Sequence, residues 1–390
     1  MGDPHKNLKY IHVAGTNGKG SVSAMLSSVL IEAGFTTGLY TSPYISSFNE
    51  RIKINGEDIS NDEIAEITSY VSRLAKSMQD IPTEFELVTC IAIEYYNKKK
   101  CDIVVMEVGL GGRLDSTNAI PAPEVAVITS IGLDHTEYLG NTIAEIAAEK
   151  SGIIKRGCVT VASNQQGSAL NEVKKACKRE GSKLVIADNT AIYIGGTLDG
   201  QSFSADGYEE LFIKLLGRHQ LQNASTVLTV IDILQKNGWK ISNDDVKNGL
   251  ANAKWPARFE VLKRDPVFIV DGAHNPLGAQ TVRDTLEELF GDKKIVFLIG
   301  LLADKDYIGI IDKIADKAKK IITVTPENPR AMPASELAKI IGLRYNVETE
   351  CCENVAKGVE RSIEVADHDD IICAFGSLYM SGTIRNCFID

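Results

Sequence analysis

The sequence predicts an α/β protein built from two domains. Three observations predict this class: short apolar runs alternate with helical periods, a glycine-rich turn joins the first run to the first helix, and the alternation restarts after a polar break. Strands that alternate with helices are typical of mostly parallel sheets. We therefore expect an N-terminal P-loop-type domain over residues 1–257, with a mostly parallel sheet and a small antiparallel patch, and a smaller C-terminal Rossmann-like α/β domain over residues 258–390.

The first domain begins with a buried strand candidate at residues 10–14. A glycine-rich turn follows it, and then apolar residues recur at helical spacing from Val22 to Ala33 before Gly34 ends the helix. Short β-like runs over residues 186–213 predict the antiparallel patch. The other elements expected here are strands at 37–40, 102–106, 125–131 and 159–162, helices at 84–96, 143–155 and 220–236, and turns at Gly195-Gly196, Asp199-Gly200 and Asp206-Gly207.

The second domain follows a polar break that contains two prolines, Pro256 and Pro266. Proline is poorly tolerated inside helices and central strands, and the apolar alternation restarts directly after the second proline. The expected elements are strands at 267–270, 294–300, 320–324 and 370–375 and a helix at 277–290.

The composition is that of a folded globular protein. Of 390 residues, 44% are hydrophobic and 24% are charged, which argues against disorder and coiled coil. The net charge of -10 repels polyanions, so we expect no nucleic-acid partner. The 8 cysteines form no C-x-x-C pair, and the sequence shows neither an apolar leader nor a membrane-length apolar run. We expect reduced thiols, no membrane association and a cytoplasmic location.

The turn after the first strand predicts a nucleotide phosphate loop. Its sequence is Gly15-Thr-Asn-Gly-Lys-Gly-Ser21, placed where backbone N–H groups and a helix N-terminus favour a polyphosphate, with Lys19 as the point charge. The loop departs from the G-x-x-x-x-G-K-[ST] pattern, because Val13 replaces the first glycine and Gly20 separates Lys19 from Ser21. A glycine-rich turn with a solvated lysine is the alternative interpretation.

Two further strand ends carry chemically active side chains. Glu107 follows one apolar run, and Asp134-His135 follow another. Ligands of open α/β sheets bind at this carboxyl edge, where a glutamate can hold Mg²⁺. A glutamate that caps the next segment and a structural histidine are the alternatives. The convergence of Lys19, Glu107 and His135 on one edge of one sheet favours a site.

Other candidate residues also have ordinary structural interpretations. Lys150 and Glu149 lie on a predicted helix whose charges form a solvated face with i,i+4 pairing. In the second domain, Asp271 and His274 follow a strand, where an aspartate accepts a ribose hydroxyl or a substrate amine, although an Asx turn explains the same residues. Arg258, in the polar break, either reaches a phosphate or is a surface arginine.

Taken together, the motifs resemble those of folylpolyglutamate synthases and the related bifunctional dihydrofolate synthases, members of the Mur ligase superfamily. The matches run in order along the chain from residue 12 to residue 307, with a weaker match beyond. The matching segments are HVAGTNGKGS (12–21), TSP (41–43), FNERI (48–52), PTEFE (82–86), EVGLGGRLD (107–115), GLDHT (132–136), EKSGI (149–153), DGAHNP (271–276), LADKDY (302–307) and, more weakly, FGSLY (375–379).

The resemblance implies an ATP-dependent ligase that joins the carboxylate of a folate or of dihydropteroate to the amine of L-glutamate. The γ-phosphate would pass first to the carboxylate, which is a poor electrophile, and the amine would then displace phosphate from the acyl phosphate. The resemblance also implies a monomer. Two other functions stay open: an ATP-binding homologue without catalysis, and a Mur-type ligase for another acid.

The resemblance also implies roles for individual residues. ATP would contact Asn17, Gly18, Lys19, Gly20, Ser21, Asn223, Arg258 and Asp271. Two Mg²⁺ ions are implied, the first near Ser42 and Glu107 and the second near His135 and a carbamylated Lys150. Lys19, Glu107, His135 and Lys150 would be catalytic. The pterin side of the substrate would contact Thr83, Glu84, Phe85, Glu86, Leu114, Asp115 and Ser116, and the incoming glutamate would contact His274 and Ser377.

One feature departs from the family pattern. Family members usually carry a few dozen residues before the phosphate-loop strand, which begins here at about residue 9. We expect either that a first helix and part of the pteridine pocket are absent or that the natural start lies upstream.

Overall fold

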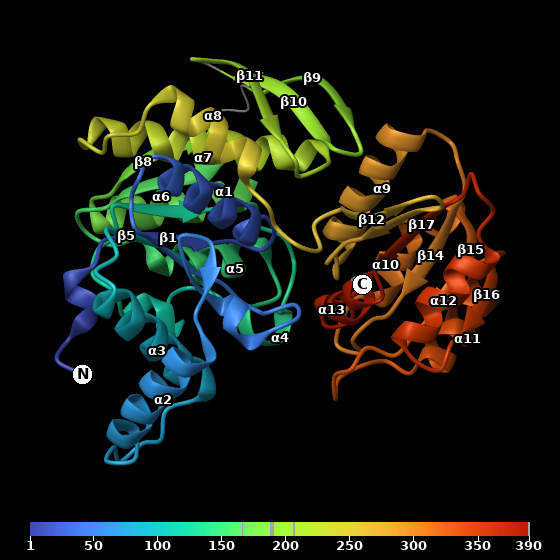
Figure 1. The fold of residues 1–390 in the computed structure, drawn as a ribbon, viewed down its shortest axis with the longest axis horizontal. Coiled ribbons are helices and arrows are strands. Elements are labelled where there is room, and N and C mark those ends of the chain that lie inside the picture. The colour runs from blue at the N-terminus through green and yellow to red at the C-terminus, as the bar shows by residue number, and fades with distance from the viewer. Residues whose placement is uncertain (166, 188–190, 206, 389–390) are drawn as a thin grey trace. The chain divides into compact units, whose positions relative to one another are not determined.

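The computed structural model describes residues 1–165, 167–187, 191–205 and 207–388, and the chain forms two compact units (Figure 1). The first unit comprises Met1–Ile194, Ser202–Lys214 and Gln220–Lys254. The second comprises Gly195–Gln201, Leu215–His219 and Trp255–Asp390. The domain boundary between residues 257 and 258 stays a prediction; the long segment of the second unit begins at Trp255.

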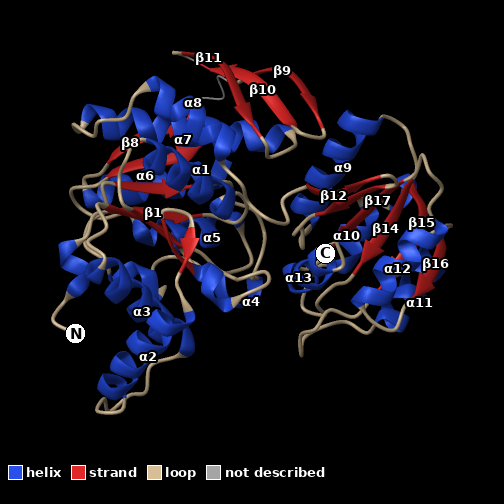
Figure 2. Ribbon diagram, viewed as in Figure 1, coloured by secondary structure: helices blue, strands red, loops and turns tan. Residues whose placement is uncertain are grey.

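In the described part of the chain, the first unit is built on an eight-stranded sheet (Figure 2). In sheet order, its strands are β4 (Glu57–Asp58), β3 (Ile52–Ile54), β2 (Thr37–Tyr40), β5 (Ile103–Glu107), β1 (Tyr10–Ala14), β6 (Val125–Ile128), β7 (Val159–Ser163) and β8 (Lys183–Ala187). All neighbours from β2 to β8 pair in parallel, and the hairpin of β3 and β4 extends one edge antiparallel. Because β1 lies between β5 and β6, the turn after β1 opens at the middle of the carboxyl edge.

Helices cover this sheet because its central strands are hydrophobic on both sides; all five residues of β1 are buried. The helices of this part of the chain are α1 (Lys19–Glu32), α2 (Asn61–Ala75), α3 (Glu84–Lys98), α4 (Thr136–Leu139), α5 (Ile143–Lys150), α6 (Gly167–Glu180), α7 (Arg218–Lys236) and α8 (Asn243–Asn252), with short 3-10 turns at Pro4–Asn7, Phe48–Arg51, Ser116–Ala119 and Ser151–Ile153. Apolar side chains of α2 and α3 share one buried cluster with Tyr40 and Met106. Those of α6 share another with Ala126 and Ile128.

A small sheet is formed by β9 (Ile192–Thr197), β10 (Gly200–Ala205) and β11 (Tyr208–Ile213), with β10 in the middle. Since two residues join β9 to β10, these strands run antiparallel, which confirms the predicted antiparallel patch. The patch begins at Ile192 rather than residue 186, because Lys183–Ala187 joins the parallel sheet as β8. Asp206, a predicted turn residue, lies outside the described residues, as do residues 188–190.

The second unit contains a sheet whose order is β12 (Glu260–Arg264), β13 (Val267–Val270), β17 (Ile371–Phe375), β14 (Ile295–Ile299), β15 (Ala318–Thr323) and β16 (Glu348–Cys351). Only β12 is antiparallel to its neighbour among these described strands. Its helices are α9 (Pro276–Phe290), α10 (Tyr307–Asp312), α11 (Ala334–Arg344), α12 (Val355–Val365) and α13 (Leu378–Asn386), with a 3-10 turn at Ala315–Lys317.

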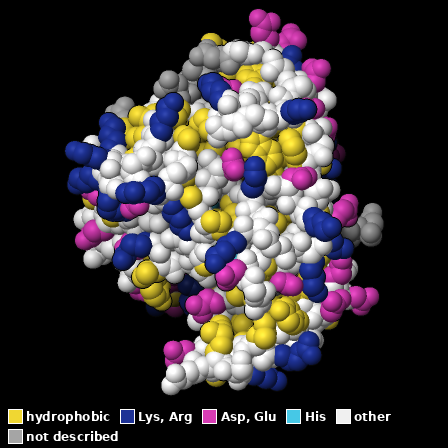
Figure 3. All heavy atoms as spheres, turned by 90° about the vertical axis from the view of Figure 1, so that its left-hand side faces the viewer, with side chains coloured by type: hydrophobic (Ala, Val, Ile, Leu, Met, Phe, Trp, Pro, Cys, Tyr) yellow, Lys and Arg dark blue, Asp and Glu magenta, His cyan; other side chains and the backbone are white. Residues whose placement is uncertain are grey.

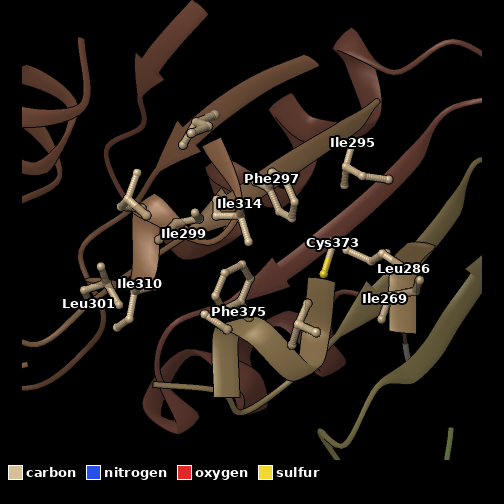
Figure 4. Close-up of a cluster of buried hydrophobic side chains, with 14 of the residues drawn as sticks. Ile269, Leu286, Ile295, Phe297, Ile299, Leu301, Ile310, Ile314, Cys373 and Phe375 are labelled. Carbon is tan, nitrogen blue, oxygen red and sulfur yellow. The ribbon is translucent and has the colours of Figure 1, made fainter. Parts of the chain in front are cut away.

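Both faces of this second sheet are covered, because successive residues of a strand point to opposite sides. On β14, Ile295, Phe297 and Ile299 pack with side chains of α9, α10 and α11 (Figure 4). Val296 and Leu298 pack on the other face with side chains of α12 and α13. The unit is therefore a doubly wound α/β domain, as the alternation predicts.

Two predicted boundaries are wrong at the edge where the site lies. The helix expected at 143–155 ends at Lys150, where a 3-10 turn that contains Gly152 follows, because glycine disfavours the interior of a helix. Gly152 also packs closely on Arg113: a Cβ on it would lie 2.3 Å from the Cβ of Arg113. The strand expected at 125–131 ends at Ile128. There the Thr129 hydroxyl donates to the carbonyls of Ala14 and Asn17, which turns the chain toward the phosphate loop.

The surface carries charges of both signs. On the face in Figure 3, acidic and basic side chains are interspersed, with hydrophobic side chains between them. The 8 cysteines, all within the described ranges, are free thiols. Among the described residues, we find no helix that is both long and apolar enough to cross a membrane.

Candidate active site

The phosphate loop follows β1 and is held by close backbone contacts. Thr16 N–H donates to the carbonyl of Ser130 at 2.8 Å, which ties the loop to the segment after β6. Only glycine fits at position 15, since a Cβ there would lie 1.8 Å from Thr129 Oγ1. Gly18 has a φ of 88°, and a Cβ on it would lie 2.6 Å from Asn223 Oδ1. The structure thus brings Asn223, on α7, against the loop.

Two lysine amines meet at one carbonyl of this loop. Lys19 Nζ donates to the carbonyl of Gly15 at 3.1 Å, and Lys150 Nζ donates to the same oxygen at 2.8 Å. The Lys150 side chain reaches it from the end of α5 and is 5% exposed. Burial, followed by the positive charge of Lys19, lowers the pKa of Lys150 to about 7, although Asp134 and Asp115 act in the opposite direction. A neutral amine at Lys150 is therefore accessible near neutral pH.

A buried carboxylate lies on the adjacent strand. Glu107 is the last residue of β5, pairs in register with Val13 of β1, and is 4% exposed. The backbone N–H of Ser42 approaches Glu107 Oε2 at 3.4 Å. A carboxylate and a hydroxyl suit Mg²⁺, which prefers oxygen ligands. Since the described residues contain no group of three His, Cys, Asp or Glu able to hold a metal, an ion here would take its other ligands from phosphates and water.

His135 is the N-cap residue of α4, in the segment that follows β6. Its backbone is left-handed, with a φ of 50°, and its N–H donates to Asp134 Oδ1 at 2.9 Å. The Asp134 side chain is 8% exposed and that of His135 38%. Left-handed backbone at a non-glycine residue is uncommon and concentrates at functional sites. The fold thus presents His135 near the carboxyl edge that carries the phosphate loop.

The end of α5 is packed against the segment that follows β5. Arg113 makes a bidentate ion pair with Glu149, with Nη2 at 2.7 Å from Oε1. A Cβ on Gly112 would lie 2.8 Å from the carbonyl oxygen of Lys150 and 2.9 Å from that of Glu149. These backbone contacts set the position from which Lys150 reaches the loop.

We expect Gly112→Ala to lower the free energy of unfolding by about 1–3 kcal/mol, because the new methyl group meets backbone atoms that cannot move independently. Urea unfolding measures this loss. The matched control is Gly195→Ala, whose Cβ meets nothing within 4 Å, and which should leave the unfolding free energy nearly unchanged. Equal effects of the two substitutions would contradict the close packing of Gly112.

Some of the predicted pterin-side residues have local structural roles, and others are exposed. Thr83 and Glu86 form a capping box at the start of α3, where each side chain bonds the other residue's backbone N–H. The Phe85 ring packs on Gly109, whose Cβ would lie 2.5 Å from it. Leu114 is 81% exposed. Glu84 is the first residue of α3.

Asp115 and Ser116 organise the end of the same segment. Asp115 Oδ1 accepts the Thr117 N–H at 3.0 Å and Oδ2 accepts the Leu110 N–H at 2.8 Å, which closes the loop on itself. Ser116 Oγ lies 2.9 Å from Thr89 Oγ1. His12, which begins the matching segment at 12–21 but was given no role there, lies on β1, and its Nε2 is 2.9 Å from Thr117 Oγ1. Complete burial lowers the pKa of His12 to about 3, so the imidazole that contacts this loop is uncharged at neutral pH.

The predicted residues of the second unit also gather at a carboxyl edge, at the ends of β13 and β17. The carbonyl of Ala273 accepts the N–H of Gly376 at 2.9 Å, which joins the two loops that carry His274 and Ser377. His274 Nδ1 lies 2.8 Å from the carbonyl of Gly272. Ser377 Oγ accepts the N–H of Tyr379 at 3.2 Å at the start of α13. These residues form a polar group within the unit.

Asp271 and Arg258 lie at the start of that group. Both oxygens of Asp271 accept backbone N–H groups, from Phe259 at 2.7 Å and from Ala273 at 2.7 Å. Burial raises the pKa of Asp271, and the nearby Arg258 charge opposes this. Asp271 therefore makes a turn of the Asx kind, and it also ties the chain near Arg258 to the strand end.

Comparisons with known proteins place the chain in a family. A model described as the Mur ligase middle domain matches residues 13–231, and one described as "Mur ligase, glutamate ligase domain" matches residues 257–378. The dihydrofolate synthase/folylpolyglutamate synthase of Bacillus subtilis is 37% identical over 397 residues, covering 99% of this chain and 91% of that protein. This chain belongs to the folylpolyglutamate synthase/dihydrofolate synthase family of Mur ligases. The resemblance drawn from its motifs is confirmed.

Solved structures of this family share its fold. A Mycobacterium tuberculosis folylpolyglutamate synthase complexed with ADP and AMPPCP matches with a TM-score of 0.92 and 30% identity, over 100% of this chain and 93% of that one. Escherichia coli FolC in complex with DHPP and ADP matches with a TM-score of 0.88 and 28% identity, over 98% of this chain and 89% of that one. The predicted α/β class, with its parallel sheet, antiparallel patch and second α/β domain, is confirmed.

Proposed function

We propose that this chain is an ATP-dependent ligase that forms an amide between a folate carboxylate and L-glutamate. The observation that carries the proposal is the meeting of Lys19 and Lys150 at the Gly15 carbonyl, with buried Glu107 at the end of the adjacent strand. The relatives of this chain are folylpolyglutamate and dihydrofolate synthases. The Lys19 cation and the Glu107 carboxylate suit phosphoryl transfer, which depends on positioning and charge stabilisation.

ATP is the proposed nucleotide, and its phosphates would lie on the loop. Backbone N–H groups at the start of α1 would bind an anion there, and Lys19 would supply positive charge. The relatives that were solved in complex with ADP and AMPPCP support an adenine nucleotide as the ligand. The proposed contacts are Asn17, Gly18, Lys19, Gly20, Ser21, Asn223, Arg258 and Asp271.

Mg²⁺ is the proposed metal. Ser42 and Glu107 would hold one ion; both carry an oxygen donor, and Glu107 is buried. His135 and Lys150 would hold a second, and a lysine amine fits this role only after carbamylation, which turns a nitrogen cation into an oxygen anion. Bound Mg²⁺ supplies charge neutralisation at the transferred phosphoryl group.

The chain's own residues would orient the two steps. Lys19 holds the phosphates while the folate carboxylate oxygen takes the γ-phosphoryl group and ADP leaves. The glutamate amine then attacks the acyl carbon, the carbon–oxygen bond to phosphate breaks, and the amine loses a proton. Phe85, Leu114, Ser116 and the other pterin-side residues remain proposed folate contacts, and His274 and Ser377 remain proposed glutamate contacts. The monomeric state and cytoplasmic location remain predictions.

The test is phosphate release by the full chain with ATP and Mg²⁺. Dihydropteroate and tetrahydrofolate are compared as acceptors, each with and without L-glutamate. We expect phosphate release that requires both an acceptor and L-glutamate. Release with tetrahydrofolate but not with dihydropteroate would indicate an enzyme that only adds glutamate to folates. Release with either acceptor would indicate a bifunctional enzyme. ATP binding without release would favour the non-catalytic homologue, and release with a different acid only would favour the other ligase.

A further inference from the structure

The segment Ala257-Arg258-Phe259 has an unusual backbone in the second unit. Ala257 has a φ of 52° and Phe259 a φ of 47°, both in the left-handed region. Residues with a Cβ disfavour this region, and a bulky residue does so most. Both side chains are buried, Phe259 within the same apolar cluster as Phe297. Such a conformation persists only where surrounding bonds over-determine it.

Two carboxylates supply those bonds. Glu260 Oε2 accepts the N–H of Ala257 at 2.9 Å, and Asp271 Oδ2 accepts the N–H of Phe259 at 2.7 Å. The carbonyl of Ala257 accepts the N–H of Gly272 at 2.9 Å. Hydrogen bonds therefore hold the backbone of the segment on both sides of Arg258.

Glu260 is itself held by an arginine of α13. Arg385 Nε lies 3.2 Å from Glu260 Oε1 and 3.1 Å from Oε2. Both side chains are about three-quarters covered, at 23% and 27% exposed. A carboxylate that bonds a backbone N–H and an arginine together has little freedom to turn. The position of Ala257 is thus linked to α13 through Glu260.

These bonds determine where the Arg258 guanidinium lies. Its Nη1 donates to the carbonyl of Ala257 at 2.9 Å. A Cβ on Gly272 would lie 2.3 Å from the same nitrogen, so the guanidinium rests directly on this glycine. The φ of Gly272 is not in the left-handed region, so glycine is required here because a side chain would collide with the guanidinium.

We propose that Glu260 and Arg385 are positioning residues for Arg258, holding its guanidinium over Gly272 for contact with a nucleotide phosphate. The inference rests on the proposed function, because Arg258 is a nucleotide contact only there. Neither residue is a proposed substrate contact: Glu260 acts through the backbone N–H of Ala257, and Arg385 acts through Glu260. An isolated, partly exposed ion pair contributes little to the free energy of unfolding. We therefore expect the loss of this pair to change nucleotide affinity rather than stability.

The experiment is a double-mutant cycle read out as ATP affinity. Isothermal titration with ATP and Mg²⁺ compares the full-length wild type, Arg258→Ala, Glu260→Gln and the double variant. We expect Glu260→Gln to weaken ATP binding about tenfold, and to add nothing in the Arg258→Ala background, since a displaced guanidinium and an absent one are equivalent. The matched control is Glu350→Gln, which removes a similar ion pair with Arg361 at 2.8 Å and should leave ATP affinity unchanged.

Gly272→Ala provides an independent second variant if Glu260→Gln folds poorly. Its methyl group meets the guanidinium and the Leu378 side chain, and it should weaken ATP binding only where Arg258 is present. Equal losses from Glu260→Gln with and without Arg258, no loss in either, or an unchanged affinity in Arg258→Ala would each overturn the positioning role. Wild-type protein that binds no ATP would overturn the proposed function, and the positioning role with it.

Discussion

Lys150→Ala is expected to lower the turnover number about 10³-fold, the loss typical when a charge-stabilising group is removed from a reacting centre. The Lys150 amine is buried at the end of α5 and lies 2.8 Å from the Gly15 carbonyl, within the proposed phosphate site. Phosphate release under saturating ATP, folate and L-glutamate measures the change. Urea unfolding of the same variant shows whether the fold is retained.

A short carboxylic acid such as acetate should restore part of the lost turnover, because the missing group is proposed to be a carboxylate-like carbamate. Lys155→Ala is the matched control. Its amine donates to the carbonyls of Asn118 and Ile120 in the same unit, so its loss should reduce stability but show no rescue by the acid. Normal turnover in Lys150→Ala would contradict the catalytic role, and full loss without rescue would contradict the carbamate.

Lys19→Ala is expected to weaken ATP binding about 10- to 100-fold, since charge-assisted hydrogen bonds to phosphate contribute about 1.5–3 kcal/mol. In the structure the amine bonds two carbonyls of its own loop, those of Gly15 and Thr16, and so stands within the region where phosphates are proposed to lie. Titration calorimetry with ATP and Mg²⁺ measures the loss.

Lys178→Ala serves as the control for Lys19→Ala. It removes an exposed lysine of α6 in the same unit and changes the net charge equally, so a general electrostatic effect on ATP would appear in both variants. An affinity loss confined to Lys19→Ala supports a direct phosphate contact. Unchanged affinity in that variant would remove Lys19 from the proposed phosphate site.

Some local features of the site were missed although their sequence signals are present. Thr83 and Glu86 have the spacing of a capping box, and the structure shows that their side chains cap α3. Gly152, two residues after Lys150, signals the end of a helix that the charge pattern extended to residue 155. At Thr83 and Glu86 the family resemblance predicts substrate contacts, although the spacing also indicates a helix cap. At Gly152 the charge periodicity predicts a longer helix, although the glycine indicates its end.

Other features could not be predicted from local pattern. The left-handed backbone at Ala257 and Phe259 has no glycine to announce it, and it depends on bonds from Asp271, Gly272 and Glu260. The contact of Asn223 with Gly18 joins residues of α7 and the phosphate loop that are far apart in the chain. Such contacts follow from how helices and loops pack on a sheet, which single-segment periodicity does not encode.

The sequence by itself determined the alternation of strands and helices, the phosphate loop after the first strand, and the family motifs, because these depend on residue spacing within short segments. Only the tertiary structure decided that Lys150 reaches Gly15, 135 residues away, and shares its carbonyl with Lys19. The physical reason is strand order: with β1 between β5 and β6, the loops after these strands converge at one carboxyl edge. Close packing at Gly112 and Gly152 then sets where the buried amine ends.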